Sequence, residues 1–166
     1  MEKGIDHDRD GHKDFDFLHG NWMIRNRRLA QRLKGSDEWQ EFEATSEVIP
    51  ILNGIGNFDQ FFATFPDGKP LAGSTLRIFD PETRMWSLYW ADSRSCQLFP
   101  PVVGRFKNGS GDFYGEDVQD GTPVKVRFTW TILTPDSARW DQAMSADNGK
   151  TCEHNWEMHM TRRKGG

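Results

Sequence analysis

Apolar and polar side chains alternate with a period of two along several stretches of the chain. In residues 124–131, Val, Val, Phe and Trp alternate with Lys, Arg, Thr and Thr. Residues 86–90 and 156–162 show the same period, with mostly Trp, Leu and Met on one side. Because the side chains of a β-strand point alternately to its two faces, these stretches predict three strands that each have one buried face.

The stretch from Ser36 to Val48 allows two predictions. Ser36 could cap a short helix that places Trp39 and Phe42 on one side. The residues from 42 to 48 instead alternate between apolar or small side chains and polar ones, which is typical of a strand. We favour the strand.

Turn-forming residues recur at short intervals between these stretches. They are Asn53-Gly54, Pro66-Asp67-Gly68, Asp80-Pro81, Asn108-Gly109, Asp120-Gly121 and Asn148-Gly149. Such turns favour hairpins, and the spacing predicts an all-β fold of about eight to ten antiparallel strands. A sheet of this size either splits into a sandwich or closes into a single up-and-down β-barrel. A sandwich could bury the seven tryptophans and twelve phenylalanines in pairs, whereas a barrel could line a cavity with them.

The length of 166 residues and the absence of a linker-like stretch indicate one domain. We expect this domain at 15–164, after a flexible polar leader at 1–14. The formal net charge is -4 and like charges do not form blocks, so neither nucleic acid nor a membrane surface is an expected partner. The chain shows no signal peptide and no run of transmembrane length, and we expect a cytoplasmic protein.

The leader contains the start of a calcium-loop pattern. Asp6, Asp8, Asp10 and Gly11 match that pattern, but its twelfth position, which needs a bidentate glutamate, is Phe17. We interpret these residues as a solvated acidic segment and expect no metal site.

Two cysteines, Cys96 and Cys152, lie far apart in the sequence. They do not form a CxxC pair, which argues against a zinc site and a disulfide framework. We expect both to be reduced, buried thiols.

Other motifs resemble those of calycin barrels. Gly20 and Trp22 form a G-x-W motif at the start of the first strand, and Arg162 lies near the end of the last. In lipocalin-like and fatty-acid-binding-protein-like barrels, the tryptophan closes one end and the late basic residue packs across its ring. The resemblance implies that Trp22 lies under Arg162 as the floor of a barrel, in a cation–π contact.

A longer resemblance covers most of the chain. The stretches FDFLHGNW, PPVVGRF, FYGED, ARWDQAMSADNGKT and NWEMHMTR are similar to an uncharacterised family of bacterial calycin-like domains. That family has a barrel fold and no agreed activity, so the resemblance implies a fold but no chemistry. The chain departs from the family at Cys152, where a tryptophan is expected after GKT, which implies a differently shaped pocket or rim.

Large apolar side chains and one amide are predicted to face a common interior. The predicted ligand-binding residues are Trp90, Phe128, Trp130, Trp140, Gln142 and Met158. A largely apolar interior with few polar groups is the usual composition of a small-molecule site, and plain core packing explains each single residue equally well. The polar loop of residues 92–99, with Arg94 and Cys96, is either a portal to this interior or a simple connection.

Catalysis or haem binding would need further residues, and His159 and Glu153 are the candidate acid–base residues. His154 and His159 are five residues apart, which places them on opposite faces of a regular strand, where they cannot share a metal. His159 is also the candidate axial ligand of a haem, although the alternation places it outside the barrel. We expect no cofactor, with haem as the lesser alternative.

Binding of a small hydrophobic or amphipathic molecule inside an aromatic-lined barrel is the favoured function. The alternatives are an enzyme on the same barrel that isomerises, cyclises or hydrolyses such a molecule, a haem protein, and a structural module. The sequence shows no heptad or other interface pattern, so a homodimer stays open.

Overall fold

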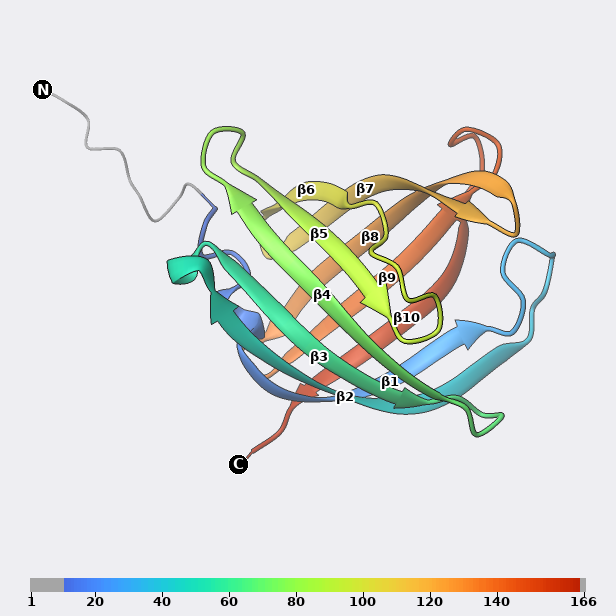
Figure 1. The fold of residues 1–166 in the computed structure, drawn as a ribbon, viewed down its shortest axis with the longest axis horizontal. Helices are drawn as coiled ribbons and strands as arrows, with labels where there is room; N and C mark the ends of the chain where they lie inside the picture. Colours follow the sequence, from blue (N-terminus) through green and yellow to red (C-terminus); the bar gives the residue numbers. More distant parts are fainter. Residues whose placement is uncertain (1–10, 165–166) are drawn as a thin grey trace, which may run out of the picture.

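The computed structural model describes residues 11–164, which form one barrel of ten β-strands with two short 3₁₀ turns (Figure 1). The elements in chain order are η2 (Asp16–Leu18), β1 (Gly20–Leu29), β2 (Trp39–Ile51), η3 (Leu52–Gly54), β3 (Gly56–Thr64), β4 (Pro70–Asp80), β5 (Met85–Asp92), β6 (Val102–Lys107), β7 (Ser110–Gln119), β8 (Thr122–Thr134), β9 (Ser137–Ser145) and β10 (Glu153–Arg162). Within residues 11–164, no helix is long and apolar enough to cross a membrane.

Each strand is antiparallel to the next, and β1 pairs with β10 to close the barrel. Closure gives both terminal strands a hydrogen-bonded neighbour on each side, so no sheet edge is left open. The prediction of an all-β up-and-down barrel is confirmed, and the sandwich alternative is wrong. The three alternating stretches are strands β5, β8 and β10, and the ambiguous stretch at 36–48 contains the start of strand β2.

The inward positions of the strands carry the apolar side chains. In β8, Val124, Val126 and Trp130 are buried, whereas Lys125 and Arg127 between them are exposed. The hydrophobic core is therefore the inside of the barrel, as the period of two requires.

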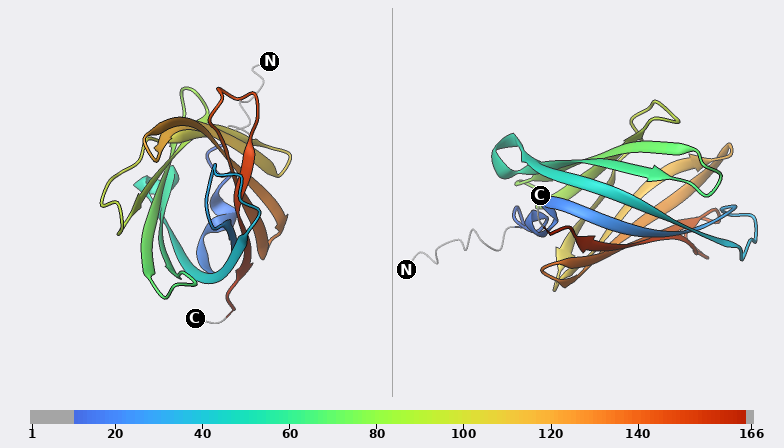
Figure 2. Two further views of the ribbon diagram at one scale, coloured as in Figure 1. Left: turned by 90° about the vertical axis from the view of Figure 1, so that its right-hand side faces the viewer. Right: turned by 90° about the horizontal axis from the view of Figure 1, so that it is seen from below.

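The two ends of the barrel differ. At one end, which we call the floor, residues 11–19 fold under the strands, and Phe15 and Leu18 are fully buried there. The Phe15 ring contacts Trp86, Phe106, Phe113 and Trp130. The opposite end, which we call the mouth, carries the loops that connect β1 to β2, β3 to β4, β5 to β6, β7 to β8 and β9 to β10 (Figures 1 and 2). The N-terminal segment thus plugs one end of the barrel only.

Trp22 and Arg162 lie opposite each other in the β1–β10 pair at the floor. The Arg162 guanidinium is 4.3 Å from the centre of the Trp22 ring, and it donates hydrogen bonds of 2.5 and 2.6 Å to the carbonyls of His19 and Phe17. The Trp22 indole N–H donates to the Leu18 carbonyl at 2.8 Å. Both side chains therefore tie the N-terminal segment to the barrel.

Part of the predicted leader packs against this floor. The carbonyl of Gly11 accepts a hydrogen bond of 2.9 Å from the Trp86 indole, and residues 11–16 form consecutive turns. The leader therefore contributes residues to the barrel before position 15. Asp6, Asp8 and Asp10 of the calcium-loop pattern lie outside the described residues.

The prediction of buried cysteines is wrong. Cys96 and Cys152 are both free and exposed. Cys96 lies in the β5–β6 loop and Cys152 immediately before β10, so neither occupies an inward strand position.

Candidate functional site

The barrel contains a cavity of about 480 Å³, a size typical of small-molecule sites. Its wall is mainly aromatic and aliphatic, and strands from all around the barrel contribute to it. Leu18 lines it at the floor and Arg28 at the mouth. Trp22 and Arg28 are six residues apart on β1, so the interior measures roughly 20 Å along this strand at about 3.3 Å per residue.

All six predicted ligand-binding residues line this cavity. They are Trp90 on β5, Phe128 and Trp130 on β8, Trp140 and Gln142 on β9, and Met158 on β10. The structure brings them together, and their role in binding a ligand stays a prediction. The loop of residues 92–99, predicted to be either a portal or a simple connection, also reaches the cavity. Its residues Arg94 and Ser95 line the mouth.

The two candidate catalytic residues do not line the cavity. His159 lies on the outer face of β10 and is 49% exposed, in line with the predicted alternation. Glu153 accepts a hydrogen bond of 2.8 Å from the backbone N–H of Leu33 and one of 3.3 Å from the Asn155 amide. Its carboxylate therefore holds the β1–β2 loop against β10, and no histidine is among the described residues that line the cavity.

Trp90 is held in one orientation on the cavity wall. Its indole N–H donates to Asp92 at 2.9 Å, and its ring lies against Phe61 in an edge contact. The same ring covers Gly73, where a Cβ atom would overlap it. Glycine at position 73 therefore makes room for the tryptophan.

A buried ion pair lies nearer the floor. Arg77 donates to Asp59 at 2.7 Å and to Asn57 at 2.9 Å, and the other Asp59 oxygen accepts from the backbone N–H of Thr75. Arg77 and Asp59 are 3% and 5% exposed, and both line the cavity. The Arg77 Nε–H is buried and has no hydrogen-bond partner among the described residues.

Three arginines gather at the mouth: Arg28 on β1, Arg32 in the β1–β2 loop and Arg94 in the β5–β6 loop. The Arg28 guanidinium lies 4.8 Å from the centre of the Trp156 ring and 5.3 Å from that of Phe65. Arg94 contacts the same Phe65 ring at 4.5 Å. The pKa of Arg28 is lowered to about 10, first by burial and then by the charges of Arg32 and Arg94. Arg28 is therefore still a cation at neutral pH.

Acidic residues also line the cavity near its mouth: Glu116, Asp117 and Asp120 of β7 and the β7–β8 turn. Burial lowers the pKa of Arg32, and the charges of Asp120, Asp117 and Glu153 partly offset this. In the described part of the chain, none of these carboxylates approaches an arginine of the mouth closely enough to form an ion pair. The mouth therefore carries both basic and acidic side chains.

A β-bulge in β10 changes which residues reach the outer face. His154 pairs with Ala143 and Trp156 with Gln142, so Asn155 is an extra residue in the strand. Asn155 and Trp156 are both buried, and His154 then faces outward with Glu157 and His159. The prediction that His154 and His159 lie on opposite faces is wrong, because the extra residue shifts the alternation.

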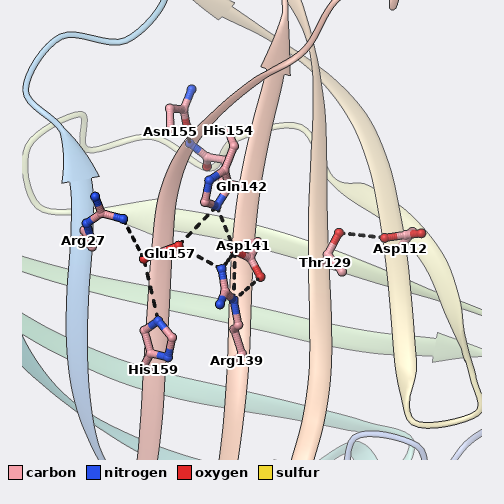
Figure 3. Close-up of polar contacts among 10 residues, drawn as sticks. All are labelled: Arg27, Asp112, Thr129, Arg139, Asp141, Gln142, His154, Asn155, Glu157 and His159. Atoms are coloured by element: carbon pink, nitrogen blue, oxygen red, sulfur yellow. Dashed lines mark hydrogen bonds and ion pairs between the residues drawn. The ribbon is translucent and has the colours of Figure 1, made fainter. Parts of the chain in front are cut away.

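The outer face of β9 and β10 carries a polar network (Figure 3). Arg139 donates to both oxygens of Asp141 and to Glu157 at 2.9 Å, and His154 lies 2.8 Å from Asp141. Burial raises the pKa of Asp141, but the hydrogen bonds and charges of Arg139 and His154 outweigh this and hold it below its ordinary value. Asp141, His154 and Glu157 could offer three metal ligands. We interpret the cluster as an ion-pair network, because Arg139 pairs with both carboxylates and Arg27 pairs with Glu157 as well.

Sequence reasoning missed three charged residues of the cavity wall, Arg28, Asp59 and Arg77. Arg28 continues the inward alternation of Trp22 and Ile24 on β1, so the period of two could have identified it. Asp59 and Arg77 are charged residues on inward positions of β3 and β4, where an apolar residue is the ordinary expectation. Only the strand pairing shows that they meet.

Comparisons with known proteins show the fold. No family model and no curated protein matches the chain. The S-type phycobiliprotein lyase CPES from Guillardia theta is similar with a TM-score of 0.62 and 11% identity, over 92% of both chains. A redesigned β-barrel has a TM-score of 0.51 and 12% identity, over 92% of this chain and 96% of that one. The redesigned barrel mFAP1, bound to DFHBI, has 0.50 and 11%, over 90% and 99%. These structures support the barrel, and membership of the bacterial calycin-like family stays a prediction.

Proposed function

We propose that this protein binds a small amphipathic molecule inside the barrel. The observation that carries the proposal is the cavity of about 480 Å³, plugged at the floor and bordered by loops at the mouth. Its wall combines aromatic rings with a few polar groups, the composition of sites that hold small molecules by apolar contact and orient them by hydrogen bonds.

Two further observations support this function. Arg77 and Gln142 place polar groups on a mostly apolar wall, and the Nε–H of Arg77 has no partner in the protein. A solved barrel of similar fold, mFAP1, is bound to the small molecule DFHBI. No observation favours the enzyme alternative at His159 or Glu153, because neither side chain lines the cavity.

The probe for this proposal is N-phenyl-1-naphthylamine, an uncharged aromatic molecule that fluoresces in apolar surroundings. We expect saturable binding with energy transfer from the cavity tryptophans Trp90, Trp130, Trp140 and Trp156. The variant Val126→Trp places a large side chain in the cavity and is expected to weaken binding at least about tenfold, or 1.4 kcal/mol. The control Lys125→Trp adds the same ring to the exposed face of the same strand and should not change binding.

A second pair of variants covers the case in which Val126→Trp does not fold. Ser46→Phe fills the cavity from β2, and Glu47→Phe adds the same ring to the outside of that strand. The proposal is wrong if the wild-type protein does not bind the uncharged probe saturably, or if folded filling variants bind it as well as their outward controls do.

A further inference from the structure

The mouth of the cavity carries a cluster of three arginines. Arg28, Arg32 and Arg94 come from two different segments of the chain and line the same end of the cavity. The charges of Arg32 and Arg94 both act on Arg28 and disfavour its cationic form. Because both charges repel that of Arg28, the cluster would be more stable with an anion between its guanidinium groups.

The described residues supply no such anion to Arg28. Within residues 11–164, no carboxylate forms an ion pair with Arg28, Arg32 or Arg94. Asp117 and Asp120 act electrostatically on Arg32, whereas every charge that shifts the pKa of Arg28 is positive. The Nε–H of Arg28 is buried and has no hydrogen-bond partner. Arg28 is therefore a partly buried cation with an unused donor.

Nearby aromatic rings hold two of the three arginines, Arg28 and Arg94, in place. Phe65 is 93% buried and contacts both Arg28 and Arg94. Trp156 lies under Arg28, and its indole N–H donates to Asn26 at 3.0 Å, which fixes the ring. Cation–π contacts of this kind orient a guanidinium while leaving its edge free to donate hydrogen bonds. The cluster is thus arranged before a ligand arrives.

Asp92, a carboxylate of the cavity wall two residues before Arg94, is engaged elsewhere. Asp92 accepts hydrogen bonds from the Trp90 indole and from the backbone N–H groups of Arg94 and Ser95. Burial raises the pKa of Asp92, and these hydrogen bonds outweigh that effect and hold it below its ordinary value. Asp92 shapes the β5–β6 loop and leaves the Arg94 guanidinium turned to Phe65.

We propose that the molecule bound in this cavity carries an anionic group at one end, which Arg28, Arg32 and Arg94 hold at the mouth while its apolar body fills the barrel. This inference rests on the proposed function and names the chemical class of its ligand. A carboxylate, a sulfonate or a phosphate has the required chemistry, because each accepts charge-assisted hydrogen bonds from guanidinium groups.

Two probes that differ only in one sulfonate group test the proposal. 8-Anilino-1-naphthalenesulfonate has the aromatic body of N-phenyl-1-naphthylamine with one added sulfonate. We expect the sulfonate to increase affinity at least about tenfold at low salt, and this advantage to shrink as salt screens the mouth. Binding of the neutral probe without any advantage for the sulfonate would overturn this inference alone, whereas failure of the neutral probe would overturn the proposed function.

Substitutions locate the anion. Arg28→Gln should remove most of the advantage of the sulfonate and change the affinity for the neutral probe less than twofold. Arg25→Gln is the matched control, because Arg25 is an exposed residue on the outer face of the same strand. If Arg28→Gln does not fold, Arg94→Gln provides the same test, since Arg94 lies exposed in a loop and its substitution should not disturb folding. Equal weakening of both probes by folded Arg28→Gln and Arg94→Gln would show packing rather than anion binding, and would overturn the proposal.

Displacement of the neutral probe by decanoate, decyl phosphate and decanol identifies the preferred anion. These competitors share one chain and differ in the end group. Stronger displacement by decanoate or by decyl phosphate than by decanol supports the proposal and assigns the ligand as a carboxylate or a phosphate. Equal displacement by all three overturns it.

Discussion

The Arg162 guanidinium lies 4.3 Å from the centre of the Trp22 ring and also donates hydrogen bonds to the carbonyls of Phe17 and His19. One side chain thereby joins the last strand, the first strand and the N-terminal segment of residues 11–19, which plugs the floor. Gly20 allows this approach, because its φ is 111° and a Cβ atom there would lie 2.9 Å from Arg162. The floor is thus held together by specific side-chain contacts, and the contribution of each contact to stability can be tested by substitution.

Trp22→Ala should destabilise the protein by about 3–5 kcal/mol, because it removes a fully buried ring together with the support for Arg162. Chemical denaturation followed by circular dichroism measures this loss. The control Met23→Ala alters the next residue, which is 39% exposed on the outer face, and should change stability by less than about 0.5 kcal/mol. Equal effects of the two substitutions would contradict the assignment of Trp22 to the floor.

Arg162→Lys tests whether the guanidinium fork matters beyond its charge. Lysine keeps the positive charge but cannot reach both carbonyls of the N-terminal segment at once, so we expect a loss of about 1.5–3 kcal/mol. The same denaturation experiment measures it, with Arg25→Lys on the outer face of β1 as the control. A stability equal to that of the control would mean that charge alone holds the plug.

The buried pair of Arg77 and Asp59 should be sensitive to loss of one partner. Asp59→Asn leaves the Arg77 guanidinium buried with no carboxylate, and we expect a destabilisation of about 3–5 kcal/mol. Glu41→Gln, at an exposed position on β2, is the control for loss of one negative charge. If both variants unfold at the same denaturant concentration, the buried pair contributes no net stability.

The sequence predicted the strands of the barrel because a period of two is a local signal. Val124 and Val126 on β8 reveal their inward positions within three residues. The choice of a barrel over a sandwich came from the resemblance of the Gly20, Trp22 and Arg162 motif to calycin barrels. The bulge at Asn155 has no such signal, since one inserted residue is recognised only from the pairing of His154 with Ala143 and of Trp156 with Gln142. Sequence reasoning therefore placed His154 on the wrong face.

The polar side of the cavity depends on contacts between distant segments. Arg28 and Arg94 are 66 positions apart and meet at Phe65, in a third segment. Each arginine alone is an ordinary surface residue by composition, and only closure of the barrel places the three segments at one end. The aromatic wall was predictable because each strand supplies its inward residues independently of the others.

Gly73→Ala should disturb the wall without removing any side chain. The added methyl group overlaps the Trp90 ring, so the ring must move or its hydrogen bond to Asp92 must break. We expect a shift in intrinsic fluorescence and weaker binding of N-phenyl-1-naphthylamine. Ala72→Ser alters the neighbouring, outward position as a control, and a Gly73→Ala protein with unchanged spectrum and affinity would show that Trp90 does not pack on Gly73 in solution.

Asp147 should make the β9–β10 turn sensitive to acid. Its carboxylate accepts hydrogen bonds from Thr151 and Ser145, and these lower its pKa from 3.8 to about 2. Because the folded state lowers this pKa, the carboxylate adds stability above about pH 3.8 and loses that contribution as the pH falls toward about 2.

The melting temperatures of the wild-type protein and of Asp147→Asn at several pH values test this expectation. The wild type should be more stable by a constant amount from pH 7 to 5, and this difference should shrink below about pH 4 as Asp147 binds a proton. Asp92 and Asp141 also titrate with lowered pKa values, but they are present in both proteins and cancel in the difference. A difference that is unchanged or larger at pH 3 would mean that the ionised carboxylate does not hold the turn.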